Sequence, residues 1–514
     1  MLKSDYYIPP TELDLLVFEK LISPDHYLRQ VKAVIDFEFV REKVRDSYSE
    51  TMGRTAMDPV LMFKLEYLQH HYGLSDREVI VEAQVNVAYR YFLDLSLDSC
   101  LPSASLLSQF RTRLGAERHQ SLFDGIVAQG RKYGLVKDRL RLKDATHVIA
   151  NIAIPSTIQL VAQVREFLLK SLEGYAPQRV ASERDEAERI SQLTNGLKDK
   201  ERLWQRVEHL RRIVNWADEL QADENSPQDS EFEQALFTAH KLLADQSDPE
   251  SKDRLRSATD TDARRGKHGV YYDGYLYDIS LDPDSEIITA VDILPANGDE
   301  AANTRNLIEA EQKAHDNQVE ALSIDGFGFQ GKVLRDLSDP EDLNLTVYVP
   351  PHSQGIQKTP YFKPQDFQTS PDGVRLMCPN EEETERRQRN SKETAWVFQF
   401  KRSQCAECPL LEQCMPKLPA KHGRSVSKND YHAEYQAARQ LAQTEAYVQV
   451  RQQHPKVERK LAETVRYHGG RRARYRGRKR VKIQYLLTSI AINIKRIVRL
   501  LTQRGQQPPA LKPI

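Results

Sequence analysis

The sequence predicts a mixed α/β protein with a helical N-terminal part and a long helical segment inserted after its first strand. Three observations lead to this prediction. Apolar residues recur at helical spacing up to about residue 135, strict alternation follows over Arg139–Ile152, and helical spacing returns between Pro155 and about residue 250. With 514 residues, of which 39% are hydrophobic, the chain is long enough to bury about three separate cores.

The composition argues against a membrane protein and against a disulfide scaffold. The sequence has no run of about 18 apolar residues, and the N-terminal MLKSDYYIPP lacks the apolar stretch of a signal peptide. Five cysteines are too few for a disulfide framework in a chain of this length. We therefore expect a cytosolic protein. The net charge is zero, but acids gather between Gln221 and Asp253, a stretch that we expect to be partly disordered, and basic residues gather toward the C-terminus.

Residues 1–135 are expected to form a helical DNA-binding domain. An apolar stripe at helical spacing ends at Gly73, and Ser75–Glu78 forms a capping box that starts the next helix. Two helices joined by a tight turn with a glycine are a helix-turn-helix candidate, in which Arg77 would face DNA. Helical hairpins without any DNA contact are also common, so this alternative stays open.

A second basic segment of the same domain is Pro102–Gly115, where Arg111 and Arg113 stand beside an apolar stripe. Both side chains are candidates for contacts with DNA phosphates. In the alternative, they extend over apolar surface and keep their charged ends in water.

The best strand of the chain, Arg139–Ile152, carries the first candidate catalytic acid. Leu142, Asp144 and Val148 share one face of this strand. A carboxylate on an apolar face costs free energy unless it is paired with a cation, so Asp144 is a candidate metal ligand. A purely structural ion pair with a neighbouring cation explains the pattern equally well.

The second candidate acid ends another predicted strand. After the helical segment, strands return at Gly269 with a hairpin around Asp282–Ser285, and a helix follows. The segment ALSIDGFGFQG, Ala321–Gly331, is then a short apolar strand that ends in Asp325, with three glycines close behind it. This arrangement exposes an acid at the C-terminal edge of a strand.

The third candidate acid lies in the most basic part of the chain. Between Arg451 and Arg480, twelve Lys or Arg residues stand against two acids, Glu458 and Glu463. Apolar residues at steps of four over Val457–Val465 predict a buried stripe, about 60° from Glu458 and nearly opposite Glu463. Glu458 is therefore expected at the edge of the core and Glu463 in solvent. A carboxylate at such an edge, flanked by cations, suits metal-dependent phosphodiester chemistry, whereas a solvated basic helix with ordinary surface acids is the alternative.

The cysteines predict a metal site of a different kind. Cys378, Cys405, Cys408 and Cys414 follow the spacing C-x26-C-x2-C-x5-C. Four thiolates complete a closed tetrahedral site, so we expect one structural Zn²⁺. Scattered reduced thiols are the alternative. Cys100 stands apart and is expected to be buried as a small apolar residue.

The motifs resemble the DDE transposases of bacterial insertion sequences, and are most similar to the insertion sequence 1182 group. The similarity covers about residues 35 to 500. It includes GRTAMDPVLMFKLEYLQHHYGLSDREV and PSASLLSQFRTRL, KDATHVIAN with Asp144, SIDGFGF with Asp325, and KVERKLAETVRYHGGRRARYRG with Glu458. The four clustered cysteines resemble the cysteine-bearing insertion of that group.

The resemblance implies a ribonuclease-H-like catalytic core, interrupted by the helical and the cysteine-bearing insertions, in which Asp144, Asp325 and Glu458 bind two Mg²⁺ ions. One ion would activate water or a 3′-hydroxyl, and the other would stabilise the leaving oxygen. A site made only of carboxylates suits hard cations such as Mg²⁺ or Mn²⁺. The chain departs from the family pattern at Val465, where a lysine is common, and in the Gly-Phe that follows Asp325.

The implied domains follow the chain order. They are 1–135, the helical N-terminal DNA-binding domain; 136–155, the first part of the core with its first strand; 156–255, the helical insertion; 256–352, the second part of the core; 353–440, the cysteine-containing insertion; and 441–514, the C-terminal part of the core with the catalytic helix and the basic segment.

The implied activity is metal-dependent cleavage and strand transfer of double-stranded DNA at the terminal inverted repeats of a mobile element, by a homo-oligomer at the bacterial nucleoid. The basic residues expected to contact DNA are Arg77, Arg111, Arg113, Arg466, Arg471, Arg472, Arg474, Arg476, Arg478, Lys479 and Arg480. Two alternatives remain open: a catalytically silent regulator or domesticated transposase that only binds DNA, and a general metal-dependent nuclease.

Overall fold

The computed structural model of this chain describes residues 9–49, 55–222, 229–352, 360–370, 373–392 and 394–503. The chain divides into two compact units. The first unit comprises Met1–Asp138, Lys143–Gln318 and Lys456–Ile514, and the second unit comprises Arg139–Leu142 and Val319–Pro455.

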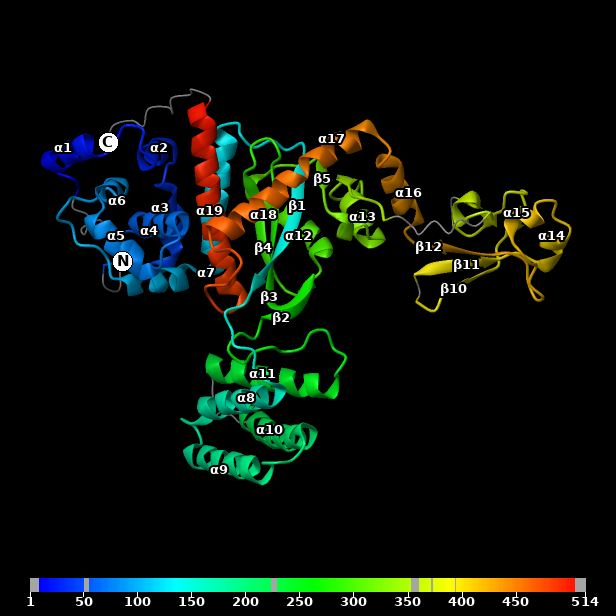
Figure 1. The fold of residues 1–514 in the computed structure, drawn as a ribbon, viewed down its shortest axis with the longest axis horizontal. Coiled ribbons are helices and arrows are strands. Elements are labelled where there is room, and N and C mark those ends of the chain that lie inside the picture. Colours follow the sequence, from blue (N-terminus) through cyan, green and yellow to red (C-terminus); the bar gives the residue numbers. More distant parts are fainter. Residues whose placement is uncertain are drawn as a thin grey trace. The chain divides into compact units, whose positions relative to one another are not determined.

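The N-terminal part of the first unit is helical, as predicted (Figure 1). Its helices are α1 (Glu12–Leu21), α2 (Tyr27–Val34), α3 (Phe39–Val44), α4 (Pro59–Tyr72), α5 (Asp76–Val85), α6 (Val87–Phe92) and α7 (Ala104–Lys132). Helix α4 ends at Gly73, whose φ of 72° lies in the left-handed region that glycine adopts without strain. Ser75 and Glu78 form the expected capping box at the start of α5. The predicted boundary between these two helices is therefore confirmed.

One mixed sheet has the strand order β2-β3-β1-β5-β6, with β4 paired to β3. Its strands are β1 (Arg141–Ile149), β2 (Arg264–His268), β3 (Val270–Leu281), β4 (Ile288–Pro295), β5 (Ala321–Ser323) and β6 (Thr346–Tyr348). Strand β3 is antiparallel to β2 and to β4, whereas β5 is parallel to β1 and to β6. The predicted strand around Asp144 and the predicted hairpin after Gly269 are both present. Helix α12 (Glu300–His315) packs against β3 and β4.

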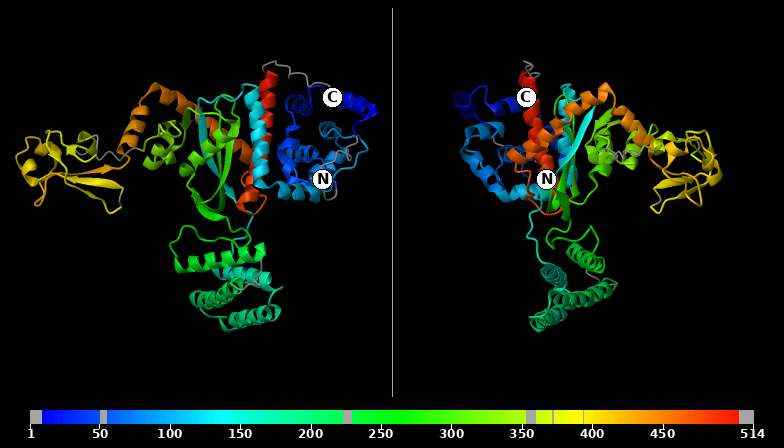
Figure 2. Two further views of the ribbon diagram at one scale, coloured as in Figure 1. Left: turned by 180° about the vertical axis from the view of Figure 1, so that it is seen from behind. Right: turned by 45° about the vertical axis from the view of Figure 1, so that its right-hand side comes forward.

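Helix α19 (Arg478–Gln503) joins the N-terminal helices to the β3–β4 hairpin. It runs alongside α7 and also packs against α4 and β4 (Figures 1 and 2). The side chain of Asn493 exchanges two hydrogen bonds of 2.8 Å with the backbone of Ile288, and the hydroxyls of Tyr277 and Ser489 lie 2.7 Å apart. These buried polar contacts fix the register of α19 on the hairpin, because each group would lose its partner if the helix slid.

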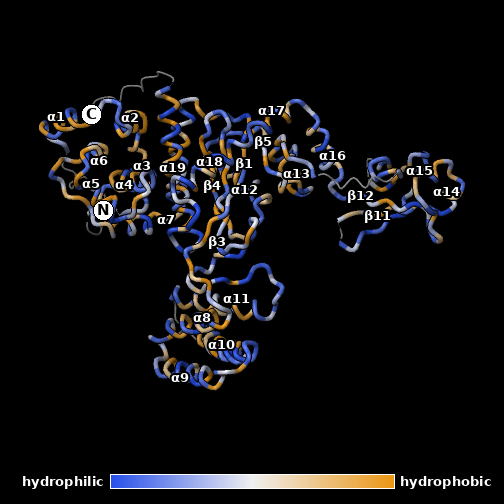
Figure 3. Tube along the Cα trace, viewed as in Figure 1, coloured by the Kyte–Doolittle hydropathy of each residue, from blue (hydrophilic) through white to orange (hydrophobic). Residues whose placement is uncertain are grey.

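The segment after β1 forms a helical bundle with its own core. Its helices are α8 (Thr157–Leu172), α9 (Pro177–Leu193), α10 (Asp199–Gln221) and α11 (Ser230–Ser247). Each shows both hydrophobic and hydrophilic residues along its length (Figure 3). The stripe that includes Val164 and Leu168 packs against the stripe that includes Leu210 and Val214, as expected. The expected partial disorder is wrong for residues 230–247, because α11 buries Phe232 in this core; residues 223–228 lie outside the described residues.

The second unit carries β5, β6 and a series of short elements. These are η2 (Gly326–Gly328), α13 (Gly331–Ser338), η3 (Pro364–Asp366), β7 (Gln368–Thr369), β8 (Leu376–Met377), β9 (Glu383–Thr384), β10 (Arg387–Arg389), β11 (Ala395–Gln399), α14 (Arg402–Ala406), α15 (Leu411–Cys414), β12 (Ser425–Asn429), α16 (His432–Leu441) and α17 (Glu445–Gln453). A small core of Phe367, Leu376, Phe398, Phe400 and Val426 holds the strands β7–β12 together. In the described ranges, no helix is long and apolar enough to cross a membrane.

Candidate catalytic acids and nucleic-acid interface

Asp144 lies in the middle of β1 and is partly buried, and its carboxylate accepts a 2.8 Å hydrogen bond from the Ala145 N–H. The alternation expected on this strand is incomplete, because Arg141 and Lys143 are buried together with Leu142. Lys143 forms an ion pair of 3.1 Å with Asp278 and donates a 2.7 Å hydrogen bond to a backbone carbonyl on α12. Burial acts to lower the pKa of Lys143, but the nearby carboxylates, Asp278 first and then Glu300 and Asp144, outweigh this effect and raise it. The cation next to Asp144 in sequence is thus neutralised on the opposite face of the strand.

Asp325 is partly buried and directly precedes the short helix η2, with its carbonyl accepting a 3.2 Å hydrogen bond from the Gly328 N–H. Glycine fits this turn closely, since a Cβ at Gly328 would lie 2.2 Å from the end of the Ile324 side chain, which would have to shift. The expected strand with its acid-bearing end is therefore present as β5 and η2.

The end of β5 is held by the helix that precedes α18. Arg451 of α17 donates hydrogen bonds to the Ile324 carbonyl (2.7 Å) and to the Ser323 hydroxyl (3.0 Å). The same hydroxyl lies 3.1 Å from Nδ1 of His454, a residue only 2% exposed. Burial, followed by the charge of Arg451, lowers the pKa of His454 to about 4, so this imidazole is neutral at pH 7. Sequence reasoning missed both residues, although they stand three residues apart in the helix that leads to Glu458.

Helix α18 (Pro455–Tyr467) buries a different face from the predicted one. Val457, Lys460 and Thr464 are 0–4% exposed, whereas Val465 is only partly buried. At about 100° per residue, this rotates the buried face so that Glu458 and Glu463 stand on its two flanks. The predicted phase was wrong because a lysine and a threonine, rather than the next aliphatic residue, occupy core positions.

The two acids of α18 consequently differ in a way that the sequence did not indicate. Glu463 is half-buried and forms ion pairs with Lys460 (2.9 Å) and Lys495 (3.0 Å), so its expected exposure to solvent is wrong. Burial acts to raise the pKa of Glu463, but these two lysines outweigh it and lower it. Glu458 is exposed, so its expected position at the edge of the core is also wrong, and within the described ranges it forms no ion pair. An unpaired carboxylate among so many cations is available to a ligand.

Asp144 and Glu458 belong to the first unit and Asp325 belongs to the second. In the part of the chain that the structure describes, no three His, Cys, Asp or Glu side chains are grouped as metal ligands.

The basic segment after α18 pairs with β1. The backbone of Ile149 donates to the Arg471 carbonyl and accepts from Ala473, each at 2.9 Å. The guanidinium of Arg471 donates to the His147 carbonyl at 2.6 Å. Arg476 donates to the Asn151 carbonyl at 3.0 Å. The segment therefore lies beside the end of the strand that carries Asp144, as an isolated parallel bridge.

These contacts change the expected set of DNA-binding residues. Arg474 donates to the Leu74 carbonyl at 3.1 Å, and Arg478 lies 3.5 Å from Asp292, so both are already used inside the first unit. Arg111 is only 6% exposed and is paired with Asp76 and Glu66, so its guanidinium is already engaged, and the expected phosphate contact stays a prediction for this residue. Arg111 lies on the buried side of α7.

Several other residues that are expected to contact DNA have exposed cationic side chains. Arg77, Arg466, Arg472, Lys479 and Arg480 are exposed and form no ion pair with any described residue. Arg113 lies 4.9 Å from the ring of Tyr48.

A small cavity of about 220 Å³ opens beside two of these cations. Lys479 and Arg480 line it from α19, and Ser108 and Thr112 line it from α7. Hydroxyl groups and unpaired cations around one cavity suit a phosphate group of a nucleic-acid backbone.

The clustered cysteines all lie in the second unit and carry free thiols. Cys378, Cys405 and Cys414 pack against the small core of the strands β7–β12. Burial is the largest cause that raises the pKa of Cys405 and of Cys414, and the neighbouring thiols add to it in both cases. Cys100 is exposed, so its expected burial is wrong.

Two segments of the chain match transposase families. Residues 16–113 match the family described as "Transposase domain (DUF772)", and residues 377–498 match the family described as "Transposase DDE domain". Together they support an insertion-sequence DDE transposase, which acts on DNA. The second match suggests a metal-dependent nuclease or transferase; it contains Glu458 and the four cysteines, whereas Asp144 and Asp325 lie outside both matches. No curated protein and no solved structure matches the chain.

Proposed function

We propose that this protein is a transposase of the insertion sequence 1182 group, which cleaves DNA at the terminal inverted repeats of its element and joins the ends to target DNA. The catalytic core would be ribonuclease-H-like, with Asp144, Asp325 and Glu458 as its metal ligands. The observation that carries the proposal is that an unpaired acid, Glu458, stands in the basic part of the segment that matches the transposase DDE family.

The strand register supports the assignment of the two aspartates. Leu142 of β1 pairs with Ser323 of β5 in a parallel register. Asp144 and Asp325 each follow this pair by two residues. Equal offsets in sequence from one parallel strand pair are the observation that supports one role for both aspartates, with Asp144 inside β1 and Asp325 just after β5.

The donor chemistry of these residues fits a divalent metal ion. Three carboxylates offer only oxygen ligands, which suit Mg²⁺ or Mn²⁺. Two such ions, when bound, would activate the attacking hydroxyl and stabilise the leaving oxygen. Arg451 and His454 would position the backbone before Asp325, because they contact Ser323 and Ile324.

Two parts of the first unit would have different roles in DNA binding. The exposed cations Arg466, Arg472, Lys479 and Arg480 would hold phosphates near the cut, because none of them is committed to an ion pair with a described residue. The exposed Arg77, at the start of α5, would contribute to reading the terminal repeats. We further propose that the protein works as a homo-oligomer on DNA at the bacterial nucleoid.

The cysteines would hold one structural Zn²⁺ through Cys378, Cys405, Cys408 and Cys414. The small core of the surrounding strands supports this assignment. So few buried residues give a β-sheet domain little stability, and small domains of this kind usually need a metal or a disulfide in addition. A site closed by four thiolates leaves no open position for water, so the zinc would be structural.

The test of the proposed function is an assay of both nicking and joining. A supercoiled plasmid that carries the DNA flanking the gene is incubated with the protein and Mg²⁺. We expect nicks at the ends of the flanking inverted repeats and strand transfer into a second plasmid, both abolished by EDTA. Binding without nicking would instead identify a catalytically silent regulator, and nicking without joining would identify a general nuclease.

A further inference from the structure

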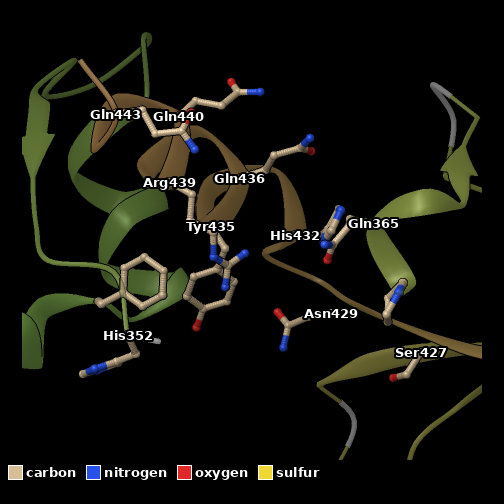
Figure 4. Close-up of a pocket in the computed structure, with 12 residues that line it drawn as sticks. His352, Gln365, Ser427, Asn429, His432, Tyr435, Gln436, Arg439, Gln440 and Gln443 are labelled. Atoms are coloured by element: carbon tan, nitrogen blue, oxygen red, sulfur yellow. The ribbon is translucent and has the colours of Figure 1, made fainter. Parts of the chain in front are cut away.

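A cavity of about 580 Å³ in the second unit has no part in the roles described so far. It is lined by residues from the loop after β5, from β12 and from α16 (Figure 4). Its volume falls in the range of pockets that bind small ligands. Because its walls come from segments far apart in sequence, the cavity exists only in the folded unit.

Aromatic rings form one wall of this cavity. The ring of Phe329 lies 4.9 Å from that of Tyr435 and 5.6 Å from that of His352, measured between centroids. The guanidinium of Arg439 lies 5.6 Å from the Phe329 ring and 5.9 Å from the Tyr435 ring. The Tyr435 hydroxyl is fixed in place, since it accepts a 2.8 Å hydrogen bond from the Gly331 N–H. Rings and a guanidinium plane held in this way offer a stacking surface to a flat ligand.

Amide side chains form most of the remaining polar lining, together with Ser427 and His432. Gln365, Asn429, Gln436, Gln440 and Gln443 each bring a donor and an acceptor to the cavity (Figure 4). None of the described residues that line the cavity is acidic. Arg439 forms no ion pair with any described residue, and it is the only arginine or lysine among the lining residues that the structure describes.

This combination of aromatic rings, amides and one arginine favours some classes of ligand over others. The absence of acids from the described lining disfavours amines and hard metal ions such as Mg²⁺, and a single arginine is too few for a polyphosphate. A flat, neutral ligand with both donors and acceptors on its edge matches aromatic rings and amides together. Nucleobases have this chemistry, and proteins read displaced bases by stacking and by hydrogen bonds to their edges.

We infer that the cavity receives a nucleobase that has left the DNA duplex close to the cleavage site. This inference rests on the proposed function, because it identifies a further part of the same substrate. Phe329 follows Asp325 by four residues, so their Cα atoms are at most roughly 14 Å apart, a span of about four base steps along one strand. A base held there would fix the strand near the candidate catalytic acid.

The test measures binding by the full-length protein in EDTA, so that neither metal nor cleavage enters. Three short duplexes of one arbitrary sequence are compared: fully paired, with one unpaired 2-aminopurine, and with an unpaired abasic nucleotide at the same position. We expect the 2-aminopurine duplex to bind roughly 5- to 100-fold more tightly than the abasic duplex, with quenching of the base by stacking. The abasic duplex controls for DNA flexibility, which a bulge raises with or without a base.

Two variants assign the preference to this cavity. Tyr435→Leu removes a ring and Arg439→Gln removes the cation, and each should reduce the preference for the base at least several-fold while binding of the abasic duplex stays unchanged. The matched control is Arg335→Gln, which removes a guanidinium that lies 4.5 Å from the Tyr431 ring, outside the cavity. The exposed Gln440→Ala is a third variant, which leaves the packing intact, and it should also weaken the preference.

The outcomes separate this inference from the proposed function. Equal binding of the 2-aminopurine and abasic duplexes by the wild-type protein overturns the inference, as does an equal loss of preference in Arg335→Gln and Arg439→Gln. A clear preference in a protein that nicks no DNA supports the cavity assignment and overturns the proposed function instead.

Discussion

Arg451 donates a 2.7 Å hydrogen bond to the carbonyl of Ile324, the residue that directly precedes Asp325. Seven residues after Arg451 the chain reaches Glu458. A single side chain at the end of α17 therefore holds the backbone before one candidate acid and stands shortly before another in sequence. Charge-assisted hydrogen bonds of this kind are stronger than neutral ones, which suits a positioning role.

Replacement of Arg451 should reduce catalysis more than DNA binding. Arg451→Leu removes the bonds to Ile324 and Ser323, and a lost bond of a charged donor costs about 1.5–3 kcal/mol, which corresponds to roughly a 10- to 100-fold slower cleavage. Single-turnover nicking and duplex binding are measured together. Gln452→Leu, an exposed change on the same helix, is the control. Equal losses of binding and of cleavage in Arg451→Leu would argue for general destabilisation.

The buried His454 predicts a dependence of stability on pH. Its folded-state pKa of about 4 lies below the usual value, so the neutral form is the one that the fold accommodates. The stabilisation is therefore complete above about pH 6.5 and is lost as the pH falls toward 4, by up to about 3 kcal/mol. Denaturant unfolding at several pH values should show a shallower loss in His454→Gln, which does not titrate. Identical pH profiles for both proteins would contradict this.

The cysteine cluster predicts zinc content. Protein purified without added metal should contain about one zinc per chain, and Cys408→Ser should lower that content sharply because a four-thiolate site loses a ligand. Elemental analysis measures this directly, with the exposed Cys100→Ser as control. Chelation should lower the unfolding temperature of the wild-type protein. Far less than one zinc per chain in the wild-type protein would rule the site out.

The exposed cations Arg472 and Arg480 should differ from the exposed Arg77 in their effect on DNA binding. Neutralising Arg472 and Arg480 should weaken binding on all sequences and reduce the salt slope by about 0.9 for each lost phosphate contact. Arg77→Gln should instead reduce discrimination between element ends and scrambled DNA, by roughly 1–3 kcal/mol. Binding to both duplexes across salt concentrations measures the two effects. If Arg77→Gln weakens both duplexes equally, the repeats are read elsewhere.

The sequence predicted elements whose signals are local. The capping box at Ser75 depends on neighbouring residues and is present in the structure, whereas the alternation around Asp144 is only partial because Arg141, Leu142 and Lys143 are all buried. The phase of α18 was wrong because Lys460, 4% exposed, keeps its amine paired with Glu463 at the edge of the core. Hydrophobic periodicity treats such a lysine as exposed, since it cannot register an ion pair formed by the fold.

Contacts between distant segments could not be predicted from the sequence either, because they too form only in the fold. Arg111 and Arg113 look equivalent in the chain, yet Arg111 is buried beside Glu66, which lies 45 residues earlier. The bond from Arg451 to Ile324 spans 127 residues. The lining of the aromatic cavity likewise comes from segments between Phe329 and Gln443. Such pairings are set by tertiary packing, and no local pattern indicates them.

Cleavage by single variants in Mg²⁺ tests most directly that Asp144, Asp325 and Glu458 act as one site. Single-turnover nicking of a plasmid with the element ends is measured for Asp144→Asn, Asp325→Asn, Glu458→Gln, the triple variant and Glu463→Gln. Residues that act as a unit give non-additive losses, so the three single variants should be as inactive as the triple variant while they still bind DNA. Glu463→Gln should remain active. An active Glu458→Gln protein together with an inactive Glu463→Gln protein would contradict the account.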